Sequence, residues 1–395
     1  MSRRSVLASV GALVLALAAP AGLTQARSAA GTEPSDLEPI RIGLAAPLTG
    51  AQASVGEGAH MGVTMAIEDL GEIAGHPIEL YEADDLCTPA DAVTAVRRLI
   101  DEDDVDAIIG PFCSGAALGA LPIVQEAGVP EVLATASSPD IYDMLGVGGN
   151  EWGFRVNLDD LTVADTLAAY MAETGTQKIF LIGQNNDFGR GAAAAYEQAL
   201  PAAGVEYAGA EFYDDGTTDF RPILTQIRQS GADGILTIMV EHDSAVFFRQ
   251  LQEVGLDVDV YTRGGVTSPL FLEMTADDPT LAEGAIGASY WTVGLDPETE
   301  ARFQERWDSP PTVHRMMAYY AMYLVLADAL ERTIEADGEV TREGLRDALR
   351  ETNLVGTPLG DIAFDEHHQA YPFLTLDTIT DGQITLIDTI PGVSR

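Results

Sequence analysis

The sequence of 395 residues is poor in basic side chains. It contains 21 Lys and Arg against 62 Asp and Glu, which gives a formal net charge of −41, and Lys178 is its single lysine. A surface this acidic repels nucleic acid and anionic lipid, so neither is expected as a partner. We interpret the surplus of carboxylates as a solvated surface suited to high salt.

Long hydrophobic runs are also lacking beyond the N-terminus. No run of about 18 apolar residues follows it, so no transmembrane helix is expected in the mature chain. Residues 1–30 are typical of a cleaved signal peptide, because Arg3 and Arg4 precede an apolar stretch from Val6 to Ala19 and small residues follow. The paired arginines resemble a twin-arginine signal, but Val6 and the absence of a following lysine leave the general secretory route open. We expect a periplasmic protein without a lipid anchor, because no cysteine lies near the predicted cleavage site.

Cysteine is scarce, and Cys87 and Cys113 are the two in the chain. An even count in an exported protein favours one disulfide between them, with two free buried thiols as the alternative. The six histidines are scattered and form no metal-binding motif, so no metal ion is expected.

Catalytic motifs are missing as well. The run from Gly56 to Gly62 resembles a dinucleotide fingerprint, but it is one residue too long and lies too far from the preceding strand. The sequence contains neither a G-x-S-x-G nucleophile elbow nor a P-loop. We therefore predict a protein that is not an enzyme and that uses no cofactor.

The sequence does contain a regular alternation of strands and helices, which is typical of βαβ units. The first series predicts strands at Ile40–Ala46, Pro77–Glu82, Asp106–Ile109 and Val129–Ala134, and helices at Ser54–Leu70, Pro89–Asp101 and Gly115–Ala127. After Phe154-Arg155-Val156-Asn157 the second series predicts strands at Lys178–Ile182, Glu206–Phe212, Gly234–Val240 and Val258–Tyr261, and helices at Leu161–Thr174, Gly189–Ala202, Phe220–Ser230 and Ser244–Val254. The last third predicts a strand at Gly284–Tyr290, a helix at Thr312–Ala336, and a hairpin of Tyr371–Thr380 and Gln383–Ile390 joined by Asp381-Gly382.

This order predicts an α/β fold of two doubly wound lobes with parallel sheets. The tail is expected to return to the first lobe and to finish on the second. The lobes would then be joined by several short crossings that form a hinge.

Two hydroxyl-rich segments follow neighbouring predicted strands. Gly110-Pro111-Phe112-Cys113-Ser114-Gly115 places Ser114 at a helix N-terminus, where free amide groups and the helix dipole favour an anion. Thr135-Ala136-Ser137-Ser138-Pro139 follows the next strand, also at the carboxyl end where α/β proteins bind ligands. Each segment could instead cap its own helix. Together they favour a shared pocket for a carboxylate.

Four segments, in this order and spacing, resemble the Leu/Ile/Val-binding protein family of type I periplasmic solute-binding proteins. They are Ile40-Arg41-Ile42-Gly43 with Pro47-Leu48-Thr49-Gly50, Asp84-Asp85-Leu86-Cys87-Thr88-Pro89, Ile109-Gly110-Pro111-Phe112-Cys113-Ser114, and Asp187-Phe188-Gly189-Arg190-Gly191. The resemblance covers essentially the whole mature chain and implies a disulfide between the two cysteines. It also implies two lobes that close on a ligand, joined by three crossings near Asn157, Tyr290 and Leu359. The N-terminal lobe would comprise residues 38–157 and 290–358, and the C-terminal lobe residues 158–289 and 359–395.

The resemblance further implies where the ligand binds. The carboxylate-binding serine of the family falls on Ser114, and its second hydroxyl residue falls on Ser137. The backbone carbonyl that receives the ligand ammonium falls on Thr135, and an aromatic side chain from the second lobe falls on Phe188.

Three positions depart from the family pattern. Val55 and Val240 stand where family members have tyrosines, and Gly264 stands where an acid pairs with the ligand ammonium. A desolvated ammonium needs such a partner, and the nearby Glu241 or Asp243 would have to supply it.

If neither Glu241 nor Asp243 pairs with an ammonium, the ligand carries none, and Arg263 beside Gly264 suits a second negative group on the ligand. We expect the substrate-binding component of an ABC importer, a monomer that delivers an amino acid or related carboxylate to an inner-membrane permease. The alternatives are the same fold binding a non-amino organic acid or amide, and a ligand sensor outside any transporter.

Overall fold

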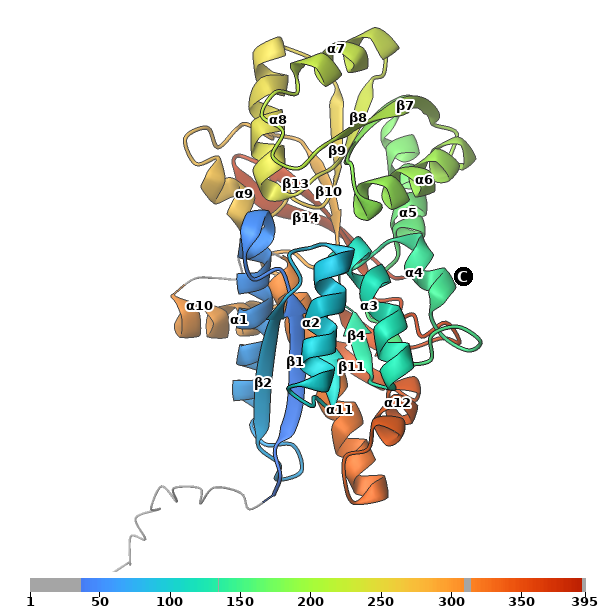
Figure 1. Cartoon of the computed structure of the whole chain (residues 1–395). Coiled ribbons are helices and arrows are strands. Elements are labelled where there is room, and N and C mark those ends of the chain that lie inside the picture. The colour runs from blue at the N-terminus through green and yellow to red at the C-terminus, as the bar shows by residue number, and fades with distance from the viewer. Residues whose placement is uncertain (1–36, 134, 309–313, 393–395) are drawn as a thin grey trace, which may run out of the picture. The chain divides into compact units, whose positions relative to one another are not determined.

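Two lobes, each built on one mainly parallel sheet, form the part of the chain that the structure describes (Figure 1). The computed structural model describes residues 37–133, 135–308 and 314–392. The predicted signal peptide of residues 1–30 lies outside these residues, as do Ala134 and Thr312 at the ends of two predicted elements.

The first lobe contains the first five strands and, from the last third of the chain, three further helices and a small hairpin. Its elements are β1 (Ile40–Ala46), η1 (Gly50–Gln52), α1 (Ala53–Leu70), β2 (Ile78–Asp84), α2 (Pro89–Asp101), β3 (Ala107–Ile109), α3 (Ser114–Ala127), β4 (Glu131–Leu133), α4 (Pro139–Met144), β5 (Gly153–Arg155), α10 (Pro297–Trp307), α11 (His314–Asp337), α12 (Arg342–Arg350), β11 (Asn353–Thr357) and β12 (Gly360–Ala363).

Its sheet is parallel throughout, in the order β2-β1-β3-β4-β5, and is covered on both faces. Alternate β1 residues such as Ile42 and Leu44 pack with α1 and α11, whereas Ala45 packs with α2 and α3. Burial on both faces explains why these strands are almost continuously apolar.

The second lobe contains a seven-stranded sheet in the order β14-β13-β10-β9-β8-β6-β7. Its elements are α5 (Asp160–Thr174), β6 (Lys178–Gln184), α6 (Asp187–Ala202), β7 (Glu206–Tyr213), α7 (Arg221–Ser230), β8 (Gly234–Ile238), α8 (Glu241–Val254), β9 (Asp259–Arg263), α9 (Pro269–Met274), β10 (Ile286–Ser289), β13 (Leu374–Thr380) and β14 (Gln383–Ile390). The strands from β7 to β10 run parallel, and the terminal hairpin β13–β14 is antiparallel. Helices α5 and α6 share one core with this sheet, and α7, α8 and α9 share the other.

The chain passes between the lobes where its buried residues change from one core to the other. Val156 belongs to the core of the first lobe and Leu158 to that of the second, and the chain returns between Ala288 and Tyr290. The last change comes between Ala370 and Leu374.

The third crossing therefore lies later than Leu359, where the sequence led us to expect it. Leu359 and Ile362 still belong to the core of the first lobe. They are held there because β11 and β12 pair as a hairpin that packs on α11, and this hairpin was not predicted from the sequence.

The prediction of two doubly wound lobes is confirmed. The bounds of β1 and α2 agree with those predicted, and the β13–β14 hairpin turns at Asp381-Gly382 as expected, with φ of 52° and 69°. The additional elements α4, β5, α9, α10, α12, β11 and β12 were not predicted.

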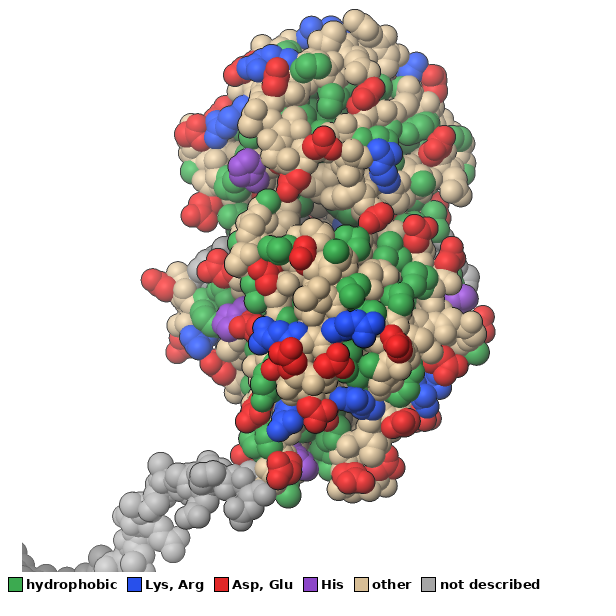
Figure 2. All heavy atoms as spheres, viewed as in Figure 1, with side chains coloured by type: hydrophobic (Ala, Val, Ile, Leu, Met, Phe, Trp, Pro, Cys, Tyr) green, Lys and Arg blue, Asp and Glu red, His purple; other side chains and the backbone are tan. Residues whose placement is uncertain are grey.

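Many of the few Lys and Arg side chains form ion pairs with carboxylates. In α10, Arg302 and Arg306 pair with Asp69 and Glu68 of α1 at 2.6 and 2.7 Å. Figure 2 shows acidic and basic side chains interspersed over the viewed face. Such exposed pairs contribute little each, about 0–1 kcal/mol. Within the described residues, no helix has the length and apolarity that a membrane span requires.

Candidate ligand-binding site

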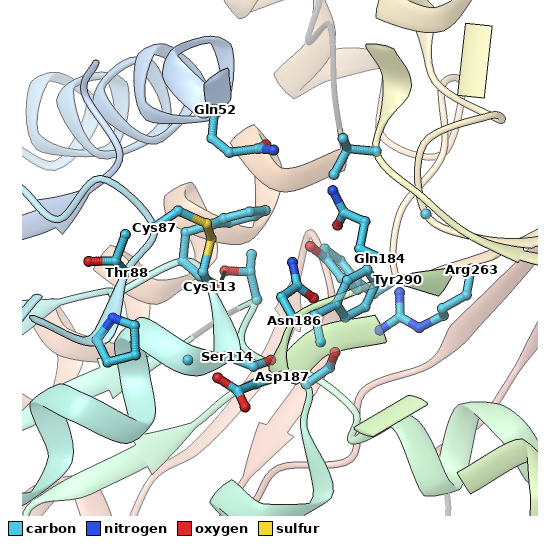
Figure 3. A pocket seen from close by; sticks show the side chains of 18 residues that line it. Gln52, Cys87, Thr88, Cys113, Ser114, Gln184, Asn186, Asp187, Arg263 and Tyr290 are labelled. Atoms are coloured by element: carbon cyan, nitrogen blue, oxygen red, sulfur yellow. Dashed lines mark hydrogen bonds between the residues drawn. A yellow bond between two sulfur atoms is a disulfide. The ribbon is translucent and has the colours of Figure 1, made fainter. Parts of the chain in front are cut away.

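A cavity of about 220 Å³ lies between the two lobes (Figure 3). Its wall is formed by loops that follow the carboxyl ends of strands, where open α/β sheets bind their ligands. The lining residues of this interlobe cavity are Gln52, Cys87, Thr88, Pro89, Phe112, Cys113, Ser114, Gly115, Thr135 and Ser137 from the first lobe, Gln184, Asn186, Asp187, Phe188, Val240, Arg263 and Gly264 from the second, and Tyr290 at a crossing.

Ser114 begins helix α3 at the cavity wall. The turn before it needs glycine at Gly110, which has φ of 97° and lies so close to the Ala45 carbonyl that a Cβ would overlap it. The first α-helical hydrogen bond of this turn runs from Ala117 N to Cys113 O, so the amides of Ser114 and the two residues after it precede the helical ladder. These amides and the positive end of the helix dipole can stabilise an anion.

The hydroxyl of Ser114 is oriented by its neighbour. Its Oγ accepts a hydrogen bond from Ser138 N at 3.2 Å, so its proton remains available to donate. Ser114 is only 2% exposed, which leaves the cavity as the direction of donation. This arrangement suits an oxyanion in the cavity.

Buried Arg155 fixes the loop that carries Ser137 and Ser138. Its Nη1 donates to the carbonyls of Ser138 at 2.9 Å and Ala136 at 3.4 Å, and its Nε donates to Gln369. The loop is therefore held from behind by a rigid polar contact, which preorganises the hydroxyl groups.

Asp160, the first residue of α5, joins the two walls of the cavity. Its backbone N donates to Ser137 O at 2.9 Å, and its Oδ2 accepts from Ser137 Oγ at 3.0 Å. Its Oδ1 accepts from Nε of Arg263 at 3.1 Å. Burial raises the pKa of Asp160 to about 6, although the Arg263 guanidinium opposes the shift.

These contacts determine what Ser137 and Arg263 offer to a ligand. When Asp160 is ionised, Ser137 Oγ gives it its proton and presents only acceptor lone pairs to the cavity. Arg263 uses Nε on Asp160 and lies with Cζ 6.0 Å from the centre of the Phe188 ring. Its guanidinium is directed toward Tyr290 and Gln184 in Figure 3.

A second buried carboxylate lies behind the wall of the second lobe. Asp243 Oδ2 accepts from Nε2 of Gln184 at 3.3 Å, and it is Gln184 that lines the cavity. Burial, followed by the charge of Asp215, raises the pKa of Asp243. Asp243 therefore orients a lining amide and does not itself reach the cavity.

Seven of the residues predicted from the sequence come together at the cavity: Ser114, Thr135, Ser137, Phe188, Val240, Arg263 and Gly264. Val55, Glu241 and Asp243 are buried elsewhere and do not line it. Val55 lies inside α1 with 2% exposure, and Gln52 just before that helix reaches the cavity instead.

Gln52, Gln184, Asn186, Asp187 and Tyr290 line the cavity and were not predicted as ligand residues. The strand-end signal could have found two of them, because Gln184 ends β6 and Asn186 follows it. Asn186 caps α6 by accepting from Gly189 N at 3.0 Å, so its amide group is left to donate.

The predicted disulfide is confirmed. Cys87 and Cys113 are bonded with Cα atoms 5.3 Å apart, and both line the cavity. The bond ties the loop after β2 to the loop that precedes α3, and so it supports the turn that presents Ser114.

Gly264 sits in a turn that disfavours any side chain. Its φ is +87°, and Gly265 follows with φ of +74° against the carbonyl of Met239. Only glycine adopts this conformation readily, so an acid at this position would be strained.

The described residues contain no group of three or more His, Cys, Asp and Glu that could hold a metal ion.

Comparisons with known proteins identify the family of the chain. A sequence profile of the family described as periplasmic binding protein matches residues 39–382. The chain is 28% identical over 335 residues to the leucine-, isoleucine-, valine-, threonine-, and alanine-binding protein of Pseudomonas aeruginosa, which covers 83% of this chain and 86% of that protein.

Two solved structures share the fold. An ABC transporter substrate-binding protein from Sphaerobacter thermophilus is 26% identical with a TM-score of 0.78, covering 90% of this chain and 98% of that chain. A solute-binding protein of an ABC transporter from R. palustris, in complex with benzoate, is 18% identical with a TM-score of 0.81 and the same coverage.

Proposed function

Because the chain belongs to the periplasmic binding protein family, we propose that it is the substrate-binding component of an ABC importer and captures a small carboxylate in the interlobe cavity. The observation that carries this proposal is the position of Ser114. It stands at the start of α3, in the cavity wall, with a hydroxyl proton available to an oxyanion.

Binding begins on the first lobe. The ligand carboxylate accepts hydrogen bonds from Ser114 Oγ and from the amides of the first turn of α3. Thr135 is oriented beside it, because its hydroxyl donates to Phe112 O at 3.1 Å.

Closure then brings in the second lobe. The hinge formed by the three crossings lets Asn186, Phe188 and Arg263 reach the ligand from the opposite wall. A ligand that contacts both lobes stabilises the closed form, and the permease recognises that form. The protein acts in the periplasm as a monomer.

The role is capture without turnover. A serine nucleophile needs a base that takes its proton, yet Ser114 Oγ receives a hydrogen bond from a backbone amide, and no histidine occurs among the described residues that line the cavity. The first acids to test are amino acids, which the Pseudomonas relative binds, and benzoate, which the R. palustris protein binds.

The test is calorimetric titration of the mature protein, purified from a periplasmic fraction, with leucine, alanine, benzoate and succinate. For any acid that binds, Ser114→Ala should weaken the affinity by roughly 5- to 100-fold, because a hydrogen bond to a charged group is lost. Thr94→Ala removes an exposed hydroxyl on α2 outside the cavity and serves as the control. An unchanged affinity in Ser114→Ala would contradict the proposal.

A further inference from the structure

Among the described residues that line the interlobe cavity, Arg263 is the one cationic side chain. It is 4% exposed and comes from the end of β9 in the second lobe. A guanidinium is buried at such a place only when its charge and its donors find partners.

Only one of its nitrogens is engaged. Nε donates to Asp160 Oδ1, and within the described part of the chain neither terminal nitrogen has a hydrogen-bond acceptor. Asp160 fixes the plane of the guanidinium, so the two terminal nitrogens form a fork with a set direction at the cavity. A carboxylate matches such a fork in shape and charge.

The same end of the cavity offers no acid to a ligand ammonium. Gly264 has no side chain, and Asp243 lies behind the wall with its oxygen on Gln184. The two carboxylate oxygens of Asp160 already accept hydrogen bonds from Ser137 and Arg263.

Asp187 is the remaining charged lining residue, and it faces elsewhere. Its Oδ2 lies so close to Gly115 that a Cβ on that glycine would overlap it. The carboxylate therefore lies beside Gly115 and not beside the guanidinium of Arg263. Figure 3 shows it directed away from Arg263.

We propose that the terminal nitrogens of Arg263 form an anion-binding subsite, and that the ligand is an acid without an ammonium group that presents a carboxylate or similar oxyanion to it. The inference rests on the proposed function, since it assigns the second end of the same cavity. An ammonium placed here would meet a buried guanidinium and would lose its hydration without gaining an anionic partner.

Matched pairs of acids that differ chiefly in the ammonium group test the inference. The mature protein is titrated with aspartate against succinate, glutamate against glutarate, and 2-aminoadipate against adipate, because each member carries one carboxylate for Ser114 and a second for Arg263. In each pair that shows saturable binding, the member without the ammonium should bind at least about tenfold more tightly.

Two variants assign that preference to Arg263. Arg263→Gln should weaken binding of the ammonium-free acid by about 10- to 100-fold, and Arg263→Lys, which keeps the charge but loses the fork, should fall between it and the wild type. If Arg263→Gln does not fold, the affinities of Arg263→Lys and the wild-type titrations with the acid pairs test the inference.

The outcomes separate the inference from the function on which it rests. Tighter binding of the amino acids, still weakened by Ser114→Ala, would overturn the inference and leave the proposed function standing. Equal affinities of wild type and Arg263→Lys for the ammonium-free acid would also overturn it. Failure of every acid to bind would overturn both.

Discussion

Asp160 and Arg263 are joined by a hydrogen bond of 3.1 Å across a sequence separation of 103 residues. The other oxygen of Asp160 accepts from Ser137, so a single buried carboxylate touches side chains of both lobes. The protonation of Asp160 therefore affects both walls of the interlobe cavity at once.

Binding of an anionic ligand should tighten as the pH falls through about 6. Burial raises the pKa of Asp160 to about 6; Arg263 and Arg155 act against this shift, and Asp159 adds to it. Once Asp160 is protonated, it no longer neutralises Arg263, which then faces the ligand with its full charge. From about pH 7.5 to about pH 5.5 the Kd should fall roughly threefold to tenfold for an acid that stays ionised throughout.

Calorimetric titration of the wild type and of Asp160→Asn at the two pH values measures this effect. The variant cannot ionise, so its Kd should not depend on pH in this range. A wild-type affinity that is constant or weaker at the lower pH would contradict the assignment.

Closure should require that position 115 carries no side chain. Gly115 and Asp187 belong to different lobes, and a Cβ at Gly115 would overlap Asp187 Oδ2. Gly115→Ala should therefore disfavour the closed form and weaken ligand binding by about tenfold, without lowering the melting temperature. Small-angle scattering should show a more open protein at a ligand concentration that saturates the wild type.

A second substitution provides the matched control. Asp187→Ala in the Gly115→Ala background removes the overlapping oxygen and should restore much of the affinity. If Gly115→Ala binds as the wild type does, a Cβ at position 115 does not hinder closure.

The fold could be predicted from the sequence wherever a segment is long and its pattern is strong. The start of helix α2 could be predicted from two residues. Thr88 is the N-cap, and its side chain accepts from Asp91 N, and Pro89 occupies the first helical position. The β11–β12 hairpin was missed because its residues alternate poorly between exposed and buried and its register shifts between Leu354 and Thr357. Its position depends on packing against α11, which local sequence does not encode.

The first-lobe half of the site could also be predicted, because strand ends and a helix N-terminus are local features. Ser114 and Ser137 were predicted in this way, and both line the interlobe cavity. The role of Asp160 was not predicted, since it lies 23 residues from Ser137 in the sequence and its partners meet only after both lobes have folded. The same holds for Asp243, which was expected beside the ligand and instead holds Gln184.

The free energy of unfolding should fall as the pH rises from about 4 to about 7. Burial raises the pKa of Asp85 and of Asp160 to about 6, and that of Asp377 to about 7. In the unfolded chain these carboxyls release their protons near pH 4, so between these values the folded state binds more protons. Stability must then decrease with pH through this window.

Calorimetry at constant ionic strength should show a melting temperature several degrees higher at about pH 5 than at about pH 8. Asp377→Asn, which imitates the protonated form, should reduce this difference. A melting temperature that rises from pH 5 to pH 8 would show that these carboxyls do not control stability.

The disulfide should stabilise the fold and preserve the site. Cys87 and Cys113 are separated by 26 positions, so the bond restricts a long loop in the unfolded chain. Replacing both by serine should cost roughly 3 kcal/mol and lower the melting temperature. Binding at a temperature where the variant remains folded should be weaker than in the wild type, because the bond supports the turn before Ser114. A variant with wild-type stability would contradict the first expectation.

A crystal structure of the protein with the tightest-binding acid of the matched pairs tests the central claim most directly. We predict a closed interlobe cavity, a ligand carboxylate on Ser114 Oγ and the first turn of α3, and an oxyanion on the terminal nitrogens of Arg263. A ligand bound outside the cavity, or one whose ammonium lies at Arg263, would contradict it.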